Sequence, residues 1–211
     1  MTLAAGLDAG LAALRLDLPA AARRKLLDFL DLLAKWNRTY NLTAIRDPQA
    51  MLTHHLLDSL AVMTAIGESA LAGRRWADVG SGAGLPGIPL AIAEPRLRLT
   101  SVEAVDKKAA FQRQARIELD LGNLEVEGRR VEDVPGGGFD AVISRAFAEL
   151  ADFVRLAGHL LAPAGRLYAM KGAPAADETA RLPQGWKLID SLPLEVPGLD
   201  ARRHLLIVGK D

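Results

Sequence analysis

Residues 76–87 read Trp-Ala-Asp-Val-Gly-Ser-Gly-Ala-Gly-Leu-Pro-Gly, a short apolar run followed by a cluster of glycines. This pattern predicts a buried strand that ends in a tight turn and leads into a helix. Glycine suits such a turn because it has no Cβ, so the backbone can take left-handed conformations and approach a ligand closely. Open α/β sheets bind nucleotides at turns of this kind, at the carboxyl ends of their strands. The stretch therefore predicts a site for an adenosine-containing cofactor.

The spacing of the glycines argues against a dinucleotide. A dinucleotide fingerprint is G-x-G-x-x-G from the end of the strand, but Leu85 occupies the third glycine position counted from Gly80. An acid and three glycines alternate here instead: Asp78, Gly80, Gly82 and Gly84. This arrangement resembles the first motif of class I S-adenosylmethionine-dependent methyltransferases, whose cofactor has no pyrophosphate. The loop then surrounds a sulfonium, an amino-acid tail and a ribose. A purely structural turn is the alternative interpretation.

Composition limits the classes of protein to which the chain can belong. Its 211 residues suit one large domain, or a core domain with a helical appendage. The 26 basic and 26 acidic residues cancel, so any contact with RNA must use a local basic patch. The absence of cysteine excludes disulfides, thiolate metal sites and cysteine nucleophiles. We expect no metal site, because the adjacent His54 and His55 lack the i, i+4 spacing of a paired helical site.

No segment of the sequence reads as a membrane or export signal. No apolar run is long enough for a membrane span, and the N-terminus lacks the charged-then-apolar pattern of a signal peptide. We therefore expect a cytoplasmic protein with no membrane partner.

Hydrophobic periodicity divides the chain into two predicted regions. Residues 1–70 form a predicted helical N-terminal region, because apolar residues recur at helical spacing between Leu26 and Trp36. Asp47-Pro48 is typical of an N-cap and first helical turn, and residues 36–43 predict a polar and aromatic connector before it. Residues 71–211 form the predicted methyltransferase domain, since strand and helix patterns alternate there.

The second region predicts an α/β fold. The predicted strands are Trp76–Val79, Leu97–Glu103, Leu124–Glu127, Phe139–Ile143, Arg166–Lys171, Trp186–Leu192 and His204–Val208. The predicted helices between them are Pro86–Ala93, Lys107–Leu119 and Ala148–Leu161. The last two strands form a hairpin-like pair. This pattern resembles the seven-stranded, Rossmann-like sheet of class I methyltransferases, whose last strand is antiparallel to the others.

Two further segments fit a cofactor of this kind. Glu103 ends the second predicted strand, where a carboxylate can accept hydrogen bonds from both ribose hydroxyls. A solvated acid that caps the following helix is the alternative. Val131 and Glu132 follow the third strand, in the loop that lies over the adenine in class I methyltransferases. There an apolar residue packs on the ring, and a backbone amide or a carboxylate meets its edge.

The fourth predicted strand ends in Ser144-Arg145-Ala146-Phe147, where the class I fold faces the transferable methyl group. Enzymes that methylate exocyclic amines resemble one another here in an Asn/Asp-Pro-Pro-aromatic tetrad, and those that methylate pyrimidine carbon use cysteine. Neither is present, so the acceptor is expected to be already nucleophilic, such as guanine N7. Catalysis then rests on in-line placement and electrostatics. Arg145 can hold the methionine carboxylate or the guanine O6 edge; a surface arginine paired with Asp140 or Glu149 is the alternative.

A series of short motifs extends along the chain on both sides of the glycine turn. They are Lys35-Trp36-Asn37, Tyr40-Asn41-Leu42-Thr43, Arg46-Asp47-Pro48, His55-Leu56-Leu57-Asp58-Ser59, Gly84-Leu85-Pro86-Gly87-Ile88-Pro89-Leu90, Arg130-Val131-Glu132, Ser144-Arg145-Ala146-Phe147, Lys171-Gly172 and Arg203-His204-Leu205. The set resembles the glucose-inhibited division protein B family, bacterial methyltransferases of small-subunit (16S) ribosomal RNA. The resemblance covers essentially the whole chain from about Lys25.

The resemblance implies methyl transfer from S-adenosylmethionine to N7 of a guanine in the decoding-region loop of 16S ribosomal RNA. The implied partner is 16S ribosomal RNA or the small ribosomal subunit, and no DNA is expected. By motif position the cofactor contacts are Gly80, Leu85, Val131, Glu132 and Arg145, to which the chemistry of the residues adds Asp78, Gly82 and Glu103. No side chain is an obligatory catalytic acid or base, and Arg145 positions the substrate. Lys171 and Arg203 are candidates for contact with an RNA phosphate.

Two other functions are compatible with the same residues. The first is a class I methyltransferase of another RNA, a small molecule or a protein. The second is an RNA- or ribosome-binding module that holds the cofactor only as a structural ligand. The first two dozen residues, rich in Ala and Leu, match no motif of the family.

Overall fold

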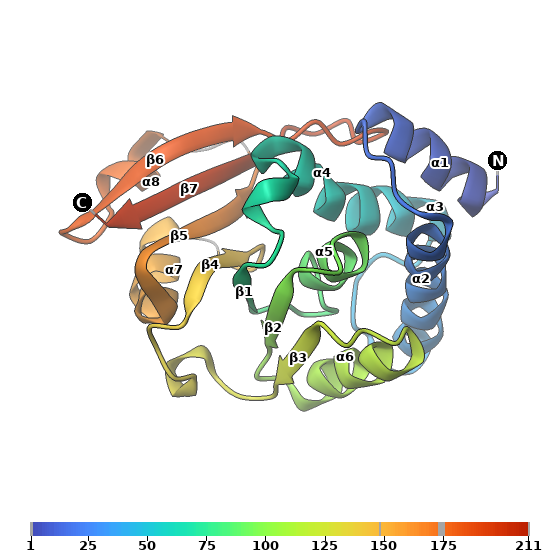
Figure 1. The fold of residues 1–211 in the computed structure, drawn as a ribbon, viewed down its shortest axis with the longest axis horizontal. Coiled ribbons are helices and arrows are strands. Elements are labelled where there is room, and N and C mark those ends of the chain that lie inside the picture. Colours follow the sequence, from blue (N-terminus) through green and yellow to red (C-terminus); the bar gives the residue numbers. More distant parts are fainter. Residues whose placement is uncertain (1, 148, 173–175, 211) are drawn as a thin grey trace.

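A single seven-stranded sheet forms the centre of the molecule (Figure 1) in the computed structural model, which describes residues 2–147, 149–172 and 176–210. The strands are β1 Arg75–Val79, β2 Arg98–Val102, β3 Leu124–Glu127, β4 Phe139–Ser144, β5 Leu161–Lys171, β6 Trp186–Pro193 and β7 His204–Lys210. Their order across the sheet is β3-β2-β1-β4-β5-β7-β6. The α/β class and the seven predicted strands are confirmed.

Strand direction also agrees with the predicted topology. Strands β1 to β5 pair in parallel with their neighbours, whereas β7 is antiparallel to both β5 and β6. The carboxyl ends of β1 to β5 therefore meet at one edge of the sheet. The chain moves outward from β1 to β2 and β3, then returns to β4 on the other side of β1. Such a switch point is where open α/β sheets place their ligands.

The predicted boundary between the last helix and the fifth strand is wrong. Strand β5 begins at Leu161, which pairs with Phe139 of β4, and an irregular register after Phe139 accommodates the extra residues. Pro163 and Gly165 are typical of a loop, but a bulged segment tolerates both. The predicted helix 148–161 is correspondingly shorter, and its first residue lies outside the described residues.

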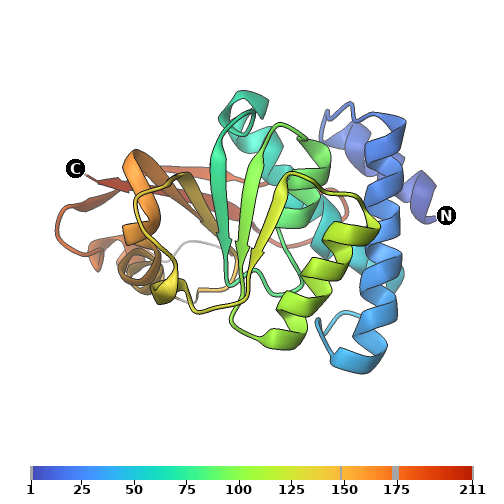
Figure 2. The same ribbon diagram turned by 60° about the horizontal axis from the view of Figure 1, so that its bottom comes forward.

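Helices cover both faces of the sheet. They are α1 Leu3–Ala13, α2 Ala20–Tyr40, α3 Pro48–Met51, α4 Asp58–Ile66, α5 Gly87–Ala93, α6 Asp106–Glu118, α7 Leu150–Ala157 and α8 Ala176–Ala180. Figure 2 shows α2 alongside α6 on one side of the sheet, with α7 on the other. Among the described residues, no helix has both the length and the apolar character that a membrane span needs.

The N-terminal helices share a core with the sheet. One apolar cluster extends from Leu7 of α1 through Phe29 of α2 to Trp76 of β1. Phe29 also meets Phe111 of α6, with ring centroids 6.1 Å apart, and both rings are fully buried. Full burial of one such side chain stabilises the fold by about 1.5–3 kcal/mol. Residues 1–70 thus pack as a layer on one face of the sheet, and a domain boundary at residue 70 stays a prediction.

Helix α2 continues through residues that the sequence pattern assigns to a connector. Trp36 packs against Tyr40, with centroids 5.1 Å apart, and meets the edge of Phe111 at 5.7 Å. These contacts favour helix over loop because they cover the apolar surface of α6. The helix ends at Asn41, whose φ of 50° is a left-handed conformation that asparagine tolerates. The connector is therefore confined to residues 41–47.

Residues 48–66 form one continuous helix with a widened middle. The predicted start is confirmed, since Asp47 Oδ1 accepts the N–H of Ala50 at 2.8 Å and Pro48 takes the first position. A π-helical turn over Leu52–Leu57 joins α3 to α4. π-Helical turns are rare in proteins, and many of those that occur lie at functional sites. Asp58, the first residue of α4, follows it directly.

Candidate active site

The glycine turn connects β1 to α5 at the carboxyl edge of the sheet. Gly80, Gly82 and Gly84 have φ angles of 66°, 58° and 78°, a region that side chains other than glycine rarely adopt. A Cβ on Gly80 would lie 2.9 Å from the Cβ of Ala146, closer than carbon atoms pack. The N–H of Gly80 donates to the carbonyl of Val102 at 2.9 Å, which ties the turn to the end of β2. The backbone therefore requires glycine at alternate positions.

Asp78 supports the turn from within the core. Its side chain is fully buried, and Oδ2 accepts the N–H of Gly87, the first residue of α5, at 2.8 Å. Burial raises the pKa of Asp78 to about 7, although the N–H of Gly87 and the charge of Arg145 oppose the rise. A Cβ on Gly87 would lie 2.7 Å from the same oxygen. Asp78 therefore fixes the start of α5, and its contact with a cofactor stays a prediction.

The raised pKa of Asp78 predicts that the free energy of unfolding falls as pH rises from about 4 to about 7. Over this interval the unfolded chain has lost the proton of Asp78 while the folded chain keeps it, so rising pH favours unfolding. The slope from this group approaches about 1.4 kcal/mol per pH unit. An Asp78→Asn variant keeps an acceptor for Gly87 and should lack this fall. Denaturant unfolding of both proteins across the interval measures the difference, and parallel pH profiles would contradict the expectation.

A buried hydrogen-bond network holds the turn from the side of α6. Ser81 Oγ accepts from Ser101 Oγ at 2.7 Å and from Gln112 Nε2 at 2.8 Å. Gln112 Nε2 also donates to the carbonyl of Gly82 at 2.8 Å. None of these three side chains was predicted as part of the site. The sequence signal that could have revealed this network is Gln112, a glutamine on the apolar stripe of a predicted helix. A buried amide needs hydrogen-bond partners.

Four predicted cofactor residues line one cavity beside the turn: Gly80, Glu103, Val131 and Glu132. We call it the cofactor cavity; its volume is about 220 Å³, and Phe147 and Leu156 add apolar wall. Val131 is buried against it, whereas Glu132 is exposed and pairs with Arg130 at 2.9 Å. The predicted residues Gly82 and Leu85 lie in the turn but outside this lining, with Leu85 buried. An apolar wall beside polar loop groups suits an adenosine.

Glu103 holds the turn and keeps acceptor capacity for a ligand. Its Oε2 accepts the N–H of Gly82 at 2.7 Å, and its Oε1 accepts the N–H of Val105, the residue before α6, at 2.8 Å. The capping contact weighed as an alternative is thus present, but the side chain is buried rather than solvated. Each carboxylate oxygen has a second lone pair, which is the capacity that a ribose hydroxyl needs. The ribose contact stays a prediction.

The predicted cations gather around a second cavity of about 350 Å³, which we call the basic cavity. Its charged and titratable lining consists of His54, His55, Asp58, Arg145, Lys171 and Arg203. Arg145 and Lys171 lie at the carboxyl ends of β4 and β5, and Arg203 directly precedes β7, which pairs with β5. The sheet therefore brings together three residues that are far apart in the sequence.

The two cavities are neighbours, separated by residues 145–147. Arg145 lines the basic cavity, Phe147 lines the cofactor cavity, and Ala146 between them lies against Gly80. Arg145 thus faces the basic cavity and not the lining of the cofactor cavity. A hydrogen bond from Arg145 to the methionine carboxylate of the cofactor stays a prediction.

Arg145 pairs with Asp58, a residue that sequence reasoning missed. Nη1 of Arg145 donates to Oδ2 of Asp58 at 2.9 Å and to the carbonyl of His54 at 3.0 Å. The alternative partners, Asp140 and Glu149, form ion pairs with other arginines. The sequence signal that could have revealed Asp58 is its place as an acid on the apolar stripe of a predicted helix. A buried carboxylate needs a partner.

His55 is a buried packing residue. Its Nε2 lies 3.0 Å from the hydroxyl of Thr43, so it ties the connector to the π-helical turn. Burial lowers the pKa of His55 to about 4, and the nearby charge of Arg145 acts in the same direction. The ring is therefore neutral at physiological pH.

Lys171 is held by groups of the protein itself. Its Nζ pairs with the carboxylate of Glu178 in α8 and donates to the carbonyl of Phe147 at 3.4 Å. Glu178 also accepts the N–H of Leu150, the first residue of α7, at 3.1 Å. The charge of Lys171 is therefore balanced in this structure, and its contact with an RNA phosphate stays a prediction.

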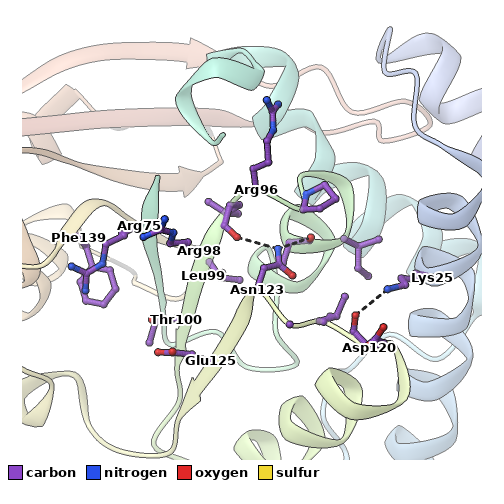
Figure 3. A pocket seen from close by; sticks show the side chains of 16 residues that line it. Lys25, Arg75, Arg96, Arg98, Leu99, Thr100, Asp120, Asn123, Glu125 and Phe139 are labelled. Carbon is purple, nitrogen blue, oxygen red and sulfur yellow. Dashed lines mark hydrogen bonds between the residues drawn. The ribbon is translucent and has the colours of Figure 1, made fainter. Parts of the chain in front are cut away.

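A larger cavity, of about 720 Å³, lies at the opposite edge of the sheet (Figure 3). Arg75 and Arg98, which are register partners at the starts of β1 and β2, lie side by side in its wall. Lys25 donates to the carbonyl of Asp120 at 3.0 Å on its other side. None of the predicted site residues lines this cavity, so the predicted chemistry concentrates at the carboxyl edge.

Solved structures with the same fold identify the fold class. The mitomycin 7-O-methyltransferase aligns with a TM-score of 0.60 and 18% identity, over 77% of this chain and 56% of that one. TrmN from Thermus thermophilus aligns with a TM-score of 0.57 and 18% identity, over 76% of this chain and 53% of that one. The chain therefore has the Rossmann-like fold of class I methyltransferases, with its glycine turn at the switch point of the sheet.

The sequence then identifies the family within that class. Residues 22–206 match the family model of rRNA small subunit methyltransferase G (GidB). Ribosomal RNA small subunit methyltransferase G of Azoarcus sp. is 56% identical over 202 residues, which cover 95% of this chain and 93% of the relative. That of Aromatoleum aromaticum is 56% identical over 214 residues, 99% of each. The chain belongs to this family of S-adenosylmethionine-dependent methyltransferases, and the resemblance read from its motifs is confirmed.

Proposed function

We propose that this chain transfers a methyl group from S-adenosylmethionine to N7 of a guanine in the decoding-region loop of 16S ribosomal RNA. Membership of the rRNA small subunit methyltransferase G family supports the RNA substrate. The motif resemblance supports the guanine and its N7 atom. The partner is then 16S ribosomal RNA, either bare or within the small ribosomal subunit.

The observation that carries the proposal is the pair of adjacent cavities at one edge of the sheet. Methyl transfer needs a donor and an acceptor side by side, and residues 145–147 separate the cofactor cavity from the basic cavity. Arg145 lines the basic cavity, and Phe147, two residues further on, lines the cofactor cavity. The three cations Arg145, Lys171 and Arg203 outnumber the two carboxylates that pair with them, so the basic cavity keeps a net positive charge for an RNA strand.

The chemistry needs placement more than proton transfer. Guanine N7 carries a free lone pair, so the chain need not supply a general base. When bound, S-adenosylmethionine supplies the methyl group on a sulfonium. The guanidinium of Arg145 donates hydrogen bonds toward guanine O6, the acceptor beside N7, and so orients the base. Phe147 and Gly80 line the cofactor cavity beside this segment, so they can hold the donor in place against the base, which keeps the reacting atoms close and aligned.

RNA geometry requires the base to leave its stack. The deep, narrow major groove of A-form RNA hides N7, so proteins read single-stranded or splayed bases. We infer that the guanine enters the basic cavity and that Lys171 and Arg203 meet flanking phosphates at its rim. Lys171 ends β5, and Arg203 directly precedes β7, which pairs with β5.

A Glu103→Gln variant is expected to bind S-adenosylmethionine about tenfold more weakly, or worse. Hydrogen bonds to a charged acceptor are worth about 1.5–3 kcal/mol, and an amide replaces one acceptor oxygen by a donor. Titration calorimetry measures the affinity. Glu125→Gln is the matched control, because Glu125 is an exposed acid of β3 that lines the cavity at the opposite edge. Unchanged affinity in the Glu103 variant would remove the ribose assignment.

The substrate is tested by offering the protein separate RNAs with labelled S-adenosylmethionine. One reaction contains bare 16S ribosomal RNA, a second contains intact small subunits, and a third contains total transfer RNA. We expect label in 16S ribosomal RNA in the first or second reaction. Label confined to transfer RNA, or to protein, would contradict the proposed substrate.

A further inference from the structure

Asp58 lines the basic cavity with a buried side chain, and no step of the proposed reaction uses it directly. We propose that Asp58 is a positioning residue for methyl transfer: its carboxylate holds Arg145 and Arg203 in the orientation that the incoming guanine and its phosphate require. The proposal rests on the proposed function, because it concerns the acceptor side of the same site. It assigns a role in catalysis to the N-terminal helical layer.

The contacts of Asp58 join three separate parts of the chain. Its Oδ2 accepts from Nη1 of Arg145 at 2.9 Å, and its Oδ1 lies 3.4 Å from Nε of Arg203. Asp58 begins α4, Arg145 follows β4, and Arg203 precedes β7. One carboxylate therefore lies between two guanidinium groups that no shared element of secondary structure connects.

The carboxylate of Asp58 is buried, so its ion pairs differ from those at a protein surface. The side chain of Asp58 is 3% exposed, whereas those of Arg145 and Arg203 are 29% and 32% exposed. A buried carboxylate is costly unless it is paired, so Asp58 constrains its partners strongly. Each arginine thus has an anchored side against Asp58 and an accessible side at the basic cavity. This is the arrangement expected of groups that are preorganised for a ligand.

The hydrogen bonds of Arg145 leave donors for a substrate. Within the part of the chain that the structure describes, Asp58 and the carbonyl of His54 are both bound through Nη1. A guanidinium has five N–H donors in a fixed planar fork. When Nη1 is anchored, the plane of the fork is set and the other donors have defined directions. Loss of the anchor would let the guanidinium rotate and would weaken its alignment with the base.

Charge gives Asp58 a second effect in the same direction. Without its carboxylate, the two guanidinium groups would repel each other across the basic cavity. Methylation at N7 also leaves the guanine with a positive charge. The carboxylate of Asp58 offsets one of the two guanidinium charges beside it, and so lowers the repulsion that a cationic base meets in the basic cavity.

The test is an Asp58→Asn variant, which keeps the shape of the side chain but removes its charge. We expect kcat for 16S ribosomal RNA to fall at least tenfold, with the affinity for S-adenosylmethionine unchanged by calorimetry. In the double variant Asp58→Asn with Arg145→Gln, kcat should fall by less than the product of the two single losses, because part of the effect of Asp58 acts through Arg145. Full kcat in Asp58→Asn, or a double variant whose losses multiply, would overturn the proposal. Asp140→Asn is the control, since Asp140 pairs with Arg74 at the opposite edge.

A second measurement decides the matter if Asp58→Asn folds poorly. Arg145→Gln and Arg203→Gln are then compared, singly and together, in a double-mutant cycle. If both arginines share Asp58 as an anchor, the loss of kcat in the double variant is smaller than the product of the two single losses. A loss equal to that product would overturn the proposal. In the folded wild type, the guanidinium Nη1–H nuclear magnetic resonance signal of Arg145 should be protected from exchange by its hydrogen bond to Asp58. This signal needs no substrate, so an unprotected Arg145 refutes the anchor even where methylation proceeds. Protection without methylation of 16S ribosomal RNA refutes only the proposed function.

Discussion

An Arg145→Gln variant should transfer methyl groups at least a hundredfold more slowly than the wild type, while binding S-adenosylmethionine normally. Removal of one preorganised donor at a reacting centre typically costs a factor of about 10² to 10³ in rate. Arg145 lines the basic cavity and not the cofactor cavity, so the loss should appear in kcat and not in cofactor affinity. Single-turnover assays with saturating cofactor separate the two quantities.

The same variant should also be less stable. The substitution removes the ion pair between Arg145 and the buried carboxylate of Asp58, which keeps only the more distant Arg203 as a partner. Breaking a buried ion pair lowers the free energy of unfolding by about 3–5 kcal/mol. Because Arg145 is partly exposed, we expect a value near the lower end, about 3 kcal/mol. Arg74→Gln, which loses an exposed pair at the other edge, is the control. Normal turnover in Arg145→Gln, or a large loss of cofactor affinity instead, would show that Arg145 does not orient the acceptor base.

A Gly80→Ala variant should lose most of its affinity for S-adenosylmethionine, by tenfold or more. The added Cβ would lie 2.9 Å from Ala146, and the φ of 66° is strained for alanine. Left-handed backbone alone costs a residue with a side chain roughly 1–2 kcal/mol, and relief of the clash would move the segment that separates the two cavities. Calorimetric titration and thermal unfolding measure the two consequences.

Two other glycines provide matched controls for this variant. Gly82 has a φ of 58°, but no atom of the described residues lies within 4 Å of the position that a Cβ would take, so Gly82→Ala tests backbone strain without the clash. Gly122 likewise has no described neighbour within 4 Å of that position and lines the cavity at the opposite edge, so Gly122→Ala tests neither the strain nor the clash. We expect the affinity to fall in the order Gly122→Ala, Gly82→Ala, Gly80→Ala, with the last the weakest. Equal affinities for all three would show that the turn does not shape the cofactor cavity.

The strands and the glycine turn were predictable because their signals are local. The run 76–79 is apolar apart from Asp78 and is followed directly by Gly80, and both properties can be read without knowledge of distant residues. The alternating glycines likewise reflect the φ angles of the chain at those positions. The antiparallel last strand was expected from the resemblance to class I methyltransferases rather than from the pattern of any single strand.

The parts that escaped prediction depend on contacts between distant residues. Trp36 and Tyr40 read as a connector because the surface of α6 that they cover lies far along the chain. Asp58 lies in one of the family motifs, yet its role required knowledge that β4 ends beside α4. The polar network of Ser81 and Gln112 is likewise a tertiary feature. Periodicity assigns residues to a buried face but does not identify the residues that pack against it.

The central claim, methylation of guanine N7, is tested most directly by the chemistry of the product. RNA methylated at guanine N7 has a cationic base whose glycosidic bond becomes labile after borohydride reduction, so aniline then cleaves the strand at that nucleotide. We predict that 16S ribosomal RNA treated with this protein and S-adenosylmethionine is cleaved at one guanine of the decoding-region loop. RNA treated with the Arg145→Gln variant should remain intact there. Incorporated methyl label with no cleavage at any guanine would contradict the account.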